Sequence, residues 1–325
     1  MSRFAALVAV IVIALVPSPA VAAPPGPALD TSPAVLAAAL HCPSPLSGSV
    51  GAPVLLVHGT SSTPDESWAF GYARVLPALG HPVCTVALPA RGWNDIQTSA
   101  EYVVHAIREM ASRSGRAVSV IGHSQGTLQP LWALRFWPDI AGLVDDYVGL
   151  APPLQGTVPA IGVCRLPGRC PEAVWQFRTG SDFIRALNSA PLPTGPSYTA
   201  VATLFDELVV PQPAASRLPG VTTAVVQSIC PGRVVEHVGL LGDAVAYALT
   251  IDALGHPGPA DTRRVHRSVC WRALMPGIDT GAYLAALPVF VANFASSALT
   301  ATWVAAEPEL RPYAGLAGPA GQRGD

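Results

Sequence analysis

A short β-branched run leads into the pentapeptide Gly122-His123-Ser124-Gln125-Gly126, and a stretch with leucines at positions 128, 131 and 134 follows it. This order predicts a buried strand, a sharp turn and a helix, the context in which G-x-S-x-G forms a nucleophile elbow. Both glycines are needed because a Cβ on either would collide where strand and helix nearly touch. The turn lifts the Ser124 hydroxyl above the sheet and aims the Gln125 N–H at a forming oxyanion. Ser124 is therefore the candidate nucleophile.

The hydrophobic segments around this motif alternate between short apolar runs and longer stretches with helical spacing. Strands are predicted at Pro53–His58, Val83–Leu88, Val118–Ile121, Tyr147–Leu150, Tyr198–Phe205 and Thr222–Ile229. Between the second and third of these, Asn94 is expected to cap a helix that Gly115 ends. Half of the residues are hydrophobic and 12% are charged, which is ample material for a large core. The alternation predicts a mainly parallel central sheet flanked by helices. Around a nucleophile elbow, this is the arrangement expected of an α/β-hydrolase fold.

The first 22 residues have the features of a signal peptide. Arg3 precedes the apolar run Leu7–Val16, and Ala20-Val21-Ala22 is a small-x-small cleavage site. The apolar run is too short to span a bilayer. We therefore expect cleavage after Ala22 and a secreted protein, in the extracellular space or the cell envelope. Residues 23–33 are expected to form a Pro/Ala-rich linker, 34–310 a single catalytic domain, and 311–325 a flexible tail.

Two stretches depart from this alternation. Ala151–Cys170 is a long excursion rich in Pro, Gly and small apolar residues, expected to be either a lid-like wall over the catalytic face or a plain surface loop. Thr280–Ala306 carries no charged side chain, and its large apolar residues form one helical face: Tyr283, Leu287, Phe290 and Phe294. Polar residues lie on the other side: Asn293, Ser296, Ser297 and Thr300. A spanning helix would be apolar all round, so we favour a helix packed beside the pocket mouth over a membrane anchor.

A nucleophilic serine needs a histidine base, and the base needs a carboxylate that fixes its tautomer. On this fold they follow the serine in the order acid, then histidine, at the carboxyl ends of strands. Asp206 directly follows a predicted strand and is the best placed acid, with Glu207 beside it as the alternative. The other acids considered lie at the wrong edge of the sheet or at helix ends: Asp139, Asp145, Asp146 and Asp182.

Three histidines follow Asp206. His237 comes after the last predicted strand by a short loop and precedes an apolar helix, which is the position expected of the base. His256 lies in a Gly-Pro turn, and His266 lies among arginines that disfavour a protonated ring. His58 precedes the nucleophile in the chain, so we interpret it as structural. The predicted triad is Ser124, Asp206 and His237.

The second oxyanion donor should come from the loop after the first core strand, where Thr60 offers its N–H and its hydroxyl. Gln125 is the other donor. The predicted pocket residues are Ser62, Ser67, His123 and Gln176.

Six cysteines in an exported chain predict three disulfides, for which fifteen pairings exist. Only Cys164 and Cys170 are paired by local reasoning, because the turn Pro167-Gly168 lies between them. The chain has no C-x-x-C pair and no His-rich cluster, so neither a metal site nor a cofactor is expected. Its net charge of −2 offers no basic face for nucleic acid.

These residues resemble the lipase B family of α/β-hydrolases, the Candida antarctica lipase B type. Serine followed by glutamine, with glycine-threonine after the first core strand, is fairly specific to this group. The matching segments follow one another in order between Ala52 and Cys270: Leu55-Leu56-Val57-His58-Gly59-Thr60, Ser124-Gln125-Gly126, Phe136-Trp137-Pro138, Ala151-Pro152, Gly156-Thr157, Val174-Trp175-Gln176, Asp206-Glu207 with Val209 and Pro211, and Glu236-His237.

The resemblance implies the same triad and the same two oxyanion donors. It also implies disulfides between Cys42 and Cys84 and between Cys230 and Cys270, which leaves Cys164 with Cys170.

The chain departs from the family pattern at places that bear on specificity. The family has a tryptophan pocket wall immediately before the nucleophile, where this chain has His123, so that side of the site should be larger or more polar. Pro153 stands where the family has an acidic residue. The third disulfide lies near the C-terminus in the family and would lie in the lid-like excursion here. The chemistry is therefore expected to carry over better than the substrate preference.

We expect a secreted serine hydrolase that acts on lipid or other hydrophobic acyl esters, with peripheral contact to a lipid interface and no stable protein partner. An acyltransferase or a polyester depolymerase with the same triad is the nearest alternative. A non-catalytic envelope binding protein on a hydrolase scaffold is the alternative from another class.

Overall fold

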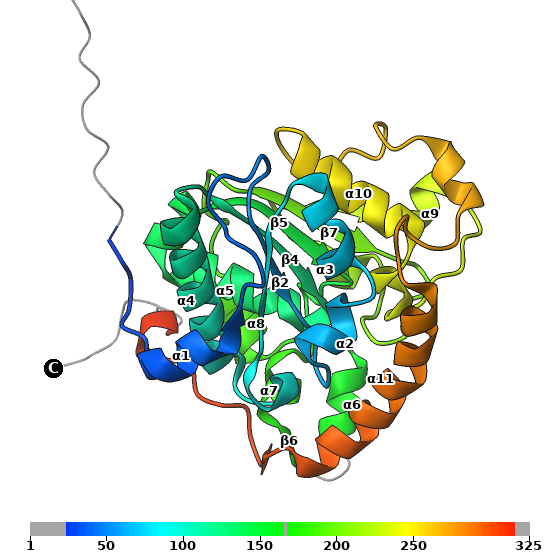
Figure 1. Cartoon of the computed structure of the whole chain (residues 1–325). Helices are drawn as coiled ribbons and strands as arrows, with labels where there is room; N and C mark the ends of the chain where they lie inside the picture. Colours follow the sequence, from blue (N-terminus) through cyan, green and yellow to red (C-terminus); the bar gives the residue numbers. More distant parts are fainter. Residues whose placement is uncertain (1–23, 166–167, 316–325) are drawn as a thin grey trace, which may run out of the picture.

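The computed structural model describes residues 24–315 except 166 and 167. The predicted signal peptide and residues 316–325 of the predicted tail lie outside them. In the described part of the chain, seven strands form a sheet in the order β1-β3-β2-β4-β5-β7-β8 (Figure 1). The edge strand β1 runs antiparallel to β3, and the other neighbours are parallel. The predicted α/β class with a mainly parallel central sheet is confirmed.

Six of the seven strands lie where the apolar runs predict them, although several end earlier, and the short edge strand β1 was not predicted. Their bounds are β1 Leu40–His41, β2 Val54–Val57, β3 Val83–Val86, β4 Val118–His123, β5 Val144–Leu150, β7 Ser197–Ala202 and β8 Thr222–Val225. The prediction that Thr222–Ile229 is one strand was wrong, because Val226–Ile229 forms the short helix α9. Asp206 does not directly follow its strand either, since the ladder stops at Ala202. Beyond that point Leu204 N–H donates to the side chain of Gln227 instead of to a neighbouring strand.

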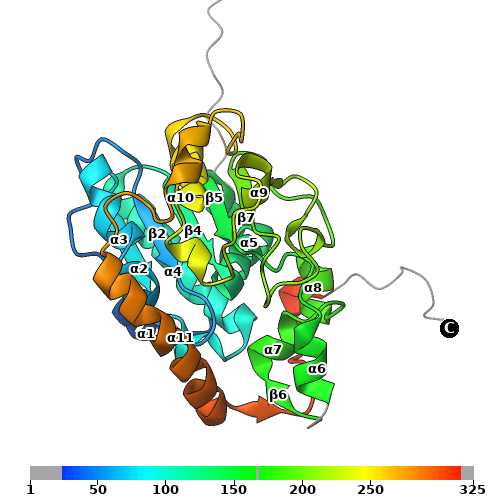
Figure 2. The same cartoon turned by 90° about the vertical axis from the view of Figure 1, so that its right-hand side faces the viewer.

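Helices cover both faces of the sheet (Figures 1 and 2). One face packs against α1 Pro33–Ala39, α4 Ile96–Ser114, α5 Leu128–Phe136 and α8 Asp182–Leu187. The other packs against α2 Pro64–Trp68, α3 Tyr72–Val75 and α10 Ala244–Gly255. The predicted helix after β3 begins one residue later than expected. Its cap is Asp95 and not Asn94, because the Asp95 carboxylate accepts the Gln97 N–H at 2.9 Å.

The two ends of the described chain pack against α4 and α5. The predicted linker is in contact with the body: Trp137 Nε1–H donates to the Pro27 carbonyl at 2.8 Å, and Thr31 N–H donates to Glu101 at 2.7 Å. At the other end Ala314 is buried, and Trp132 Nε1–H donates to the Tyr313 hydroxyl at 3.3 Å. These contacts hold residues 25–31 and 311–315 at the side of the sheet away from α10.

The excursion Ala151–Cys170 contains the helix α6 Pro159–Arg165, and the helix α7 Glu172–Gln176 follows it. The short strand β6 Cys170–Pro171 lies between them and pairs with β9 Trp303–Val304, which follows the long helix α11 Thr280–Thr300. In Figure 2 this small ladder joins the lower ends of α6 and α11. The excursion and the C-terminal helix therefore form one connected layer beside the sheet.

Among the described helices, α11 alone is long and apolar enough to cross a membrane by length and composition. One side of it packs on the body through Tyr283 and Phe290. The predicted polar side is divided, since Asn293 donates to Glu66 at 2.8 Å and Ser297 accepts from Trp93 Nε1–H at 2.8 Å. Ser296 and Thr300 are exposed. Large apolar side chains of α11 are exposed as well, among them Leu284, Val291, Leu299 and Phe294, the last of which was predicted on the packed face.

Candidate active site

The turn after β4 has the geometry that a nucleophile elbow requires. Ser124 has a φ of +54°, a left-handed conformation that is uncommon for a residue with a Cβ. A Cβ on Gly122 would stand 2.4 Å from the carbonyl oxygen of Gly126, and a Cβ on Gly126 would stand 2.3 Å from that of His58. The two glycines thus permit the close approach of strand, turn and helix that lifts Ser124 above the sheet edge.

Asp206 and His237 form a buried pair in loops beyond β7 and β8. His237 Nδ1 lies 2.9 and 3.0 Å from the two carboxylate oxygens of Asp206. The same carboxylate accepts the backbone N–H groups of Leu208 and Val209, which fix its orientation. Because a carboxylate only accepts, His237 carries its proton on Nδ1, and Nε2 keeps the basic lone pair.

Glu207, the alternative acid, has a different place. It accepts the backbone N–H of His237 at 3.2 Å, so it positions the loop of the base. The four remaining acids are engaged elsewhere: Asp139 with Arg108, Asp146 with Ser119 and Ser197, Asp182 with Arg185, and Asp145 at the exposed start of β5. His256 bonds to the carbonyl of Asp252 at the end of α10, and His266 to Ser268.

Sequence reasoning missed the side chains that tie the two catalytic loops together. Gln227 Nε2 donates both to the Thr203 hydroxyl at 2.9 Å and to the Arg233 carbonyl at 2.8 Å. Thr203 in turn donates to the Val235 carbonyl at 2.8 Å. The apolar run that contains Gln227 was interpreted as a strand, which hid this role. These bonds hold the loop of Asp206 against the loop of His237.

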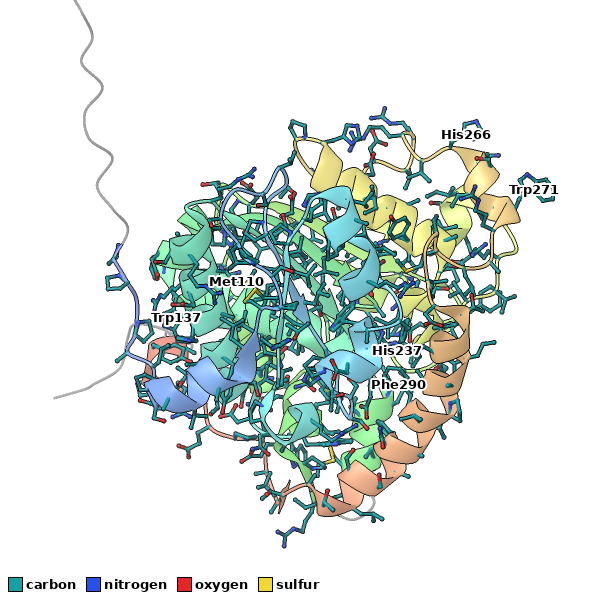
Figure 3. The ribbon with its side chains drawn as sticks, in the orientation of Figure 1. Met110, Trp137, His237, His266, Trp271 and Phe290 are labelled. Carbon is teal, nitrogen blue, oxygen red and sulfur yellow. A yellow bond between two sulfur atoms is a disulfide. The ribbon has the colours of Figure 1, made fainter. Side chains whose placement is uncertain are left out.

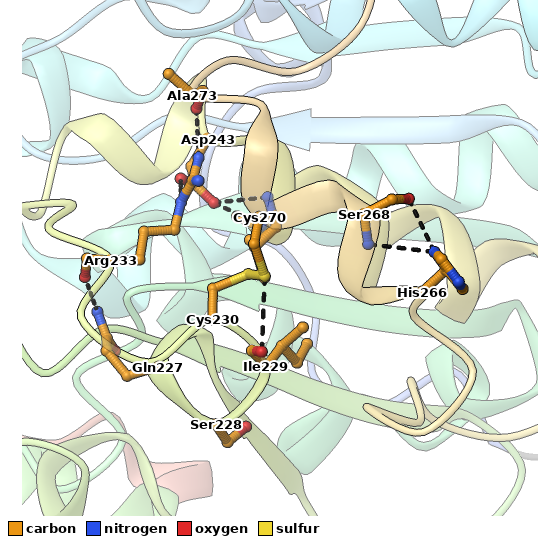
Figure 4. Close-up of a disulfide and its surroundings, with 12 residues drawn as sticks. Gln227, Ser228, Ile229, Cys230, Arg233, Asp243, His266, Ser268, Cys270 and Ala273 are labelled. Atoms are coloured by element: carbon orange, nitrogen blue, oxygen red, sulfur yellow. Dashed lines mark hydrogen bonds and ion pairs between the residues drawn. A yellow bond between two sulfur atoms is a disulfide. The ribbon is translucent and has the colours of Figure 1, made fainter.

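The base loop is also anchored from outside (Figure 4). The disulfide Cys230–Cys270 joins its start to the segment after α10, and Arg233 forms an ion pair with Asp243 at 2.5 Å. The other disulfides join Cys42 to Cys84 and Cys164 to Cys170. This is the pairing that the resemblance implies. The last of them closes the turn between α6 and β6.

Thr60 and Gln125, like Ser124, line the cavity. The Gln125 backbone N–H belongs to the first turn after the elbow, where N–H groups lack partners inside the helix. The Thr60 hydroxyl donates to Gln125 Oε1 at 2.5 Å, which fixes the Thr60 loop against the elbow. Both backbone N–H groups are therefore candidates for an oxyanion hole.

A cavity of about 500 Å³ opens over these residues, with Ser124 and His237 in its lining. Its other walls are mainly apolar and come from the excursion, the Asp206 loop and α11, including Ala160, Val163, Val209, Phe290 and Phe294. Figure 3 shows Phe290 of α11 close to His237. Among the described residues, the Ser124 hydroxyl makes no hydrogen bond to His237. Such bonds often form only when a substrate is bound.

Two of the four predicted pocket residues line this cavity, Ser62 and His123. Ser67 lies one layer behind and donates to the Ser62 hydroxyl at 2.9 Å. Gln176 does not line the cavity: its side-chain oxygen Oε1 accepts the Ile96 N–H at the start of α4, at 2.7 Å. His58 is structural: it accepts the Leu88 N–H, and burial lowers its pKa to about 4.

His123 ends β4 directly before the nucleophile. Its Nε2 lies 3.1 Å from the His237 carbonyl, and the centroids of the two rings are 4.9 Å apart. Burial, together with the neighbouring charge of His237, lowers the pKa of His123 to about 3. A neutral imidazole thus stands where the family has a tryptophan.

Within residues 24–315, without 166 and 167, no three His, Cys, Asp or Glu side chains gather as ligands for a metal ion.

Comparison with known proteins agrees with this architecture. No family model matches the chain. It is 31% identical over 301 residues to lipase B of Pseudozyma antarctica, over 89% of this chain and 86% of that protein. The crystal structure of Aspergillus fumigatus lipase B matches with a TM-score of 0.80 and 29% identity, over 92% of this chain and 77% of that one.

A more distant match shows the fold alone. A Bacillus licheniformis lipase in its propeptide form has a TM-score of 0.55 and 15% identity, over 68% of this chain and 54% of that one. The identity to the Pseudozyma protein and the extent of both chains that it covers establish the family. The resemblance that the sequence motifs suggest is confirmed: the chain belongs to the lipase B family of α/β-hydrolases.

Proposed function

We propose that the protein hydrolyses hydrophobic carboxylic esters through an acyl-enzyme on Ser124, with His237 as the base and Asp206 as the carboxylate that orients it. It is a serine ester hydrolase of the lipase and esterase class. The observation that carries the residue assignment is the buried Asp206–His237 pair, which opens into the same cavity as the elbow serine.

The reaction follows from the positions of these groups. His237 Nε2 takes the proton of the Ser124 hydroxyl as its oxygen attacks the ester carbonyl. The N–H groups of Thr60 and Gln125 stabilise the negative oxygen of the tetrahedral intermediate. His237 then gives the proton to the leaving alcohol, and the acyl group stays on Ser124. Water, activated by the same histidine, releases the acid and restores the serine.

Two features of the cavity support a hydrophobic substrate. Its walls are mainly apolar side chains from α6, α11 and the loop after Asp206. Around the opening, apolar side chains are also exposed, among them Val163, Leu208 and Val291. Exposed apolar groups gathered at a pocket mouth are typical of a surface that contacts a lipid phase. We therefore include peripheral binding to a lipid interface in the proposal.

Secretion belongs to the same proposal. The three disulfides are typical of oxidising compartments. The sequence features of residues 1–22 support export with cleavage after Ala22. Intact-mass measurement of protein recovered from the culture medium would test this: a chain that begins at Ala23 agrees with it, and a chain that still carries residues 1–22 contradicts it.

The function is tested by assaying purified, oxidised protein on alkyl esters of short and long fatty acids. We expect hydrolysis of both and loss of turnover by about 10⁴-fold or more in Ser124→Ala. Ser228→Ala is the matched control, because Ser228 is exposed on α9, away from the cavity lining. Full activity in a clean preparation of Ser124→Ala would overturn the assignment. Transfer of the acyl group to an added alcohol in preference to water would favour the acyltransferase alternative.

A further inference from the structure

The two ring nitrogens of His123 have different roles, which its surroundings determine. Nε2 lies 3.1 Å from the carbonyl oxygen of His237. A carbonyl oxygen only accepts hydrogen bonds, so the proton of this neutral imidazole sits on Nε2. Nδ1 is therefore a lone-pair acceptor. Burial keeps the ring neutral, since it lowers the pKa of His123 to about 3.

Nδ1 lies beside the nucleophile. A Cβ at Gly59 would stand 3.2 Å from this nitrogen and 3.1 Å from the Cβ of Ser124. Because Gly59 has no Cβ, the space between it, His123 and Ser124 stays open, and all three line the cavity. Among the described residues no hydrogen bond reaches Nδ1. Nδ1 is thus an acceptor on the gap that Gly59 leaves beside Ser124, the residue whose hydroxyl attacks the ester.

The polar side chains nearby do not fill it. Three hydroxyl groups of the cavity lining already donate to protein acceptors: Thr60 to Gln125 Oε1, Ser62 to the Gly59 carbonyl, and Thr157 to the Leu208 carbonyl. The remaining lining near His123 is largely apolar. The His123 side chain is only 3% exposed, so a hydrogen bond that a ligand donates to this nitrogen is shielded from solvent and is stronger than one at an exposed site.

We propose that His123 Nδ1 is a specificity-determining acceptor that selects esters with a hydroxyl group close to the scissile carbonyl. The inference rests on the proposed function and names its substrate class. The hydroxyl donates to Nδ1 while Ser124 attacks the neighbouring carbonyl. It lies on the acyl side, as in 2-hydroxy esters, or on the alcohol side, as in monoesters of diols. The shared chemistry is a donor within a few bonds of the reacting carbon.

The test compares kcat/KM for pairs of esters of similar size. Ethyl 2-hydroxyhexanoate is compared with ethyl hexanoate for the acyl side. For the alcohol side, 2-hydroxyethyl hexanoate is compared with propyl hexanoate. In the wild type we expect at least one hydroxy ester to be favoured by roughly three- to tenfold, the size of one neutral hydrogen bond. The pair that shows the preference identifies the side.

Two variants separate the nitrogens of His123. His123→Asn keeps a polar group near the place of Nδ1, whereas His123→Gln places its amide near Nε2, where it can still donate to the His237 carbonyl. We expect the hydroxyl preference to disappear in the glutamine variant and to survive in part in the asparagine variant. Each result is the ratio of kcat/KM for two esters on the same protein. A general loss of triad activity lowers both values equally and therefore cancels.

The outcomes are distinct. A ratio near one for both pairs in the wild type overturns the inference without any variant. A preference that persists unchanged in His123→Gln also overturns it. If no ester is hydrolysed by the folded wild type, the proposed function itself fails; turnover of ethyl hexanoate separates that result from failure of the subsite.

Discussion

The floor of the cavity, which we define as the elbow at Ser124 with the loops of Thr60, Asp206 and His237, is held by buried hydrogen bonds. Its walls, α6 and α11, are held differently. They pack mainly through apolar side chains, with hydrogen bonds from α11 to the body at Asn293 and Ser297. They are joined at their ends by the β6–β9 ladder and expose large hydrophobic groups such as Val163 and Val291. In the floor, a carboxylate accepts several donors at once, and Gln227 bridges two loops.

The contrast shows which parts of this chain tolerate a change of side chain. The reacting groups need positions fixed to a fraction of an ångström, which directional hydrogen bonds and close backbone contacts supply. The walls need only apolar volume, which many side chains can provide. Substitutions in the floor should therefore have large effects, whereas matched substitutions in the walls should have small ones.

The largest effect should come from the acid of the floor. Asp206→Asn leaves the size unchanged but offers an amide in place of a carboxylate, so the tautomer and the imidazolium of His237 lose their support. We expect kcat to fall by about 10⁴-fold. Glu207→Gln is the matched control, because an amide oxygen can still accept the His237 N–H. Its kcat should stay within about tenfold of wild type. Equal losses in the two variants would refute the assignment of Asp206.

Glycine substitutions compare the backbone of floor and wall. In Gly126→Ala the new Cβ would stand 2.3 Å from the His58 carbonyl oxygen, so strand and helix must separate. We expect the free energy of unfolding to fall by about 3 kcal/mol or more. Gly162 in α6 has no atom within 4 Å of such a Cβ, and Gly162→Ala should stabilise the helix by up to about 1 kcal/mol. Denaturant unfolding measures the free energy of unfolding of both variants. An unchanged value for Gly126→Ala would contradict the close approach of the helix to the His58 carbonyl.

The pH dependence of stability probes burial in the floor. The pKa of His123 is about 3 when folded, against an ordinary value of 6.5, so the unfolded chain binds one more proton between these values. The stability that this neutral histidine contributes is complete above pH 6.5 and is lost as pH falls toward 3, at about 1.4 kcal/mol per pH unit. His123→Gln should flatten the slope by one proton. Exposed His266→Gln controls for the removal of a histidine. An unchanged slope in His123→Gln would contradict the buried, neutral state.

The smallest effect is expected in the wall, in binding to lipid. Val291→Gln places an amide on the exposed side of α11 at the cavity opening, and we expect binding to phosphatidylcholine vesicles to weaken by roughly three- to tenfold. Val50→Gln is the matched control, since Val50 is also exposed but lies before β2, at the other end of the strands. Equal weakening by both changes would argue against a lipid-contacting rim.

The sequence predicts the floor better than the walls, for physical reasons. The glycines of the elbow, the order of Ser124, Asp206 and His237, and the apolar strands all follow local rules that the backbone obeys. Strand ends do not follow such rules, because Val226–Ile229 continues the predicted strand in the sequence yet forms α9 and places Gln227 between two loops. Gln176 and Ser67 were assigned to the pocket but contact α4 and Ser62 instead. Such tertiary partners are not encoded in residue spacing.

The sequence also does not show which side of α11 faces outward. Spacing identifies two sides of the helix but not which of them contacts the body, and here Asn293 and Ser297 bond to it. The side that faces outward therefore had to come from the structure.

The most direct test of the account is the intact mass of the folded, oxidised protein after reaction with a long-chain alkyl phosphonate ester, beside Ser124→Ala. The phosphonate phosphorus is attacked as an ester carbonyl would be and stays bonded to the serine oxygen. We predict one adduct per molecule in the wild type and none in the variant. An adduct that persists in Ser124→Ala, or a wild type that hydrolyses esters without forming any adduct, would contradict an activated Ser124 in an acyl-accepting cavity.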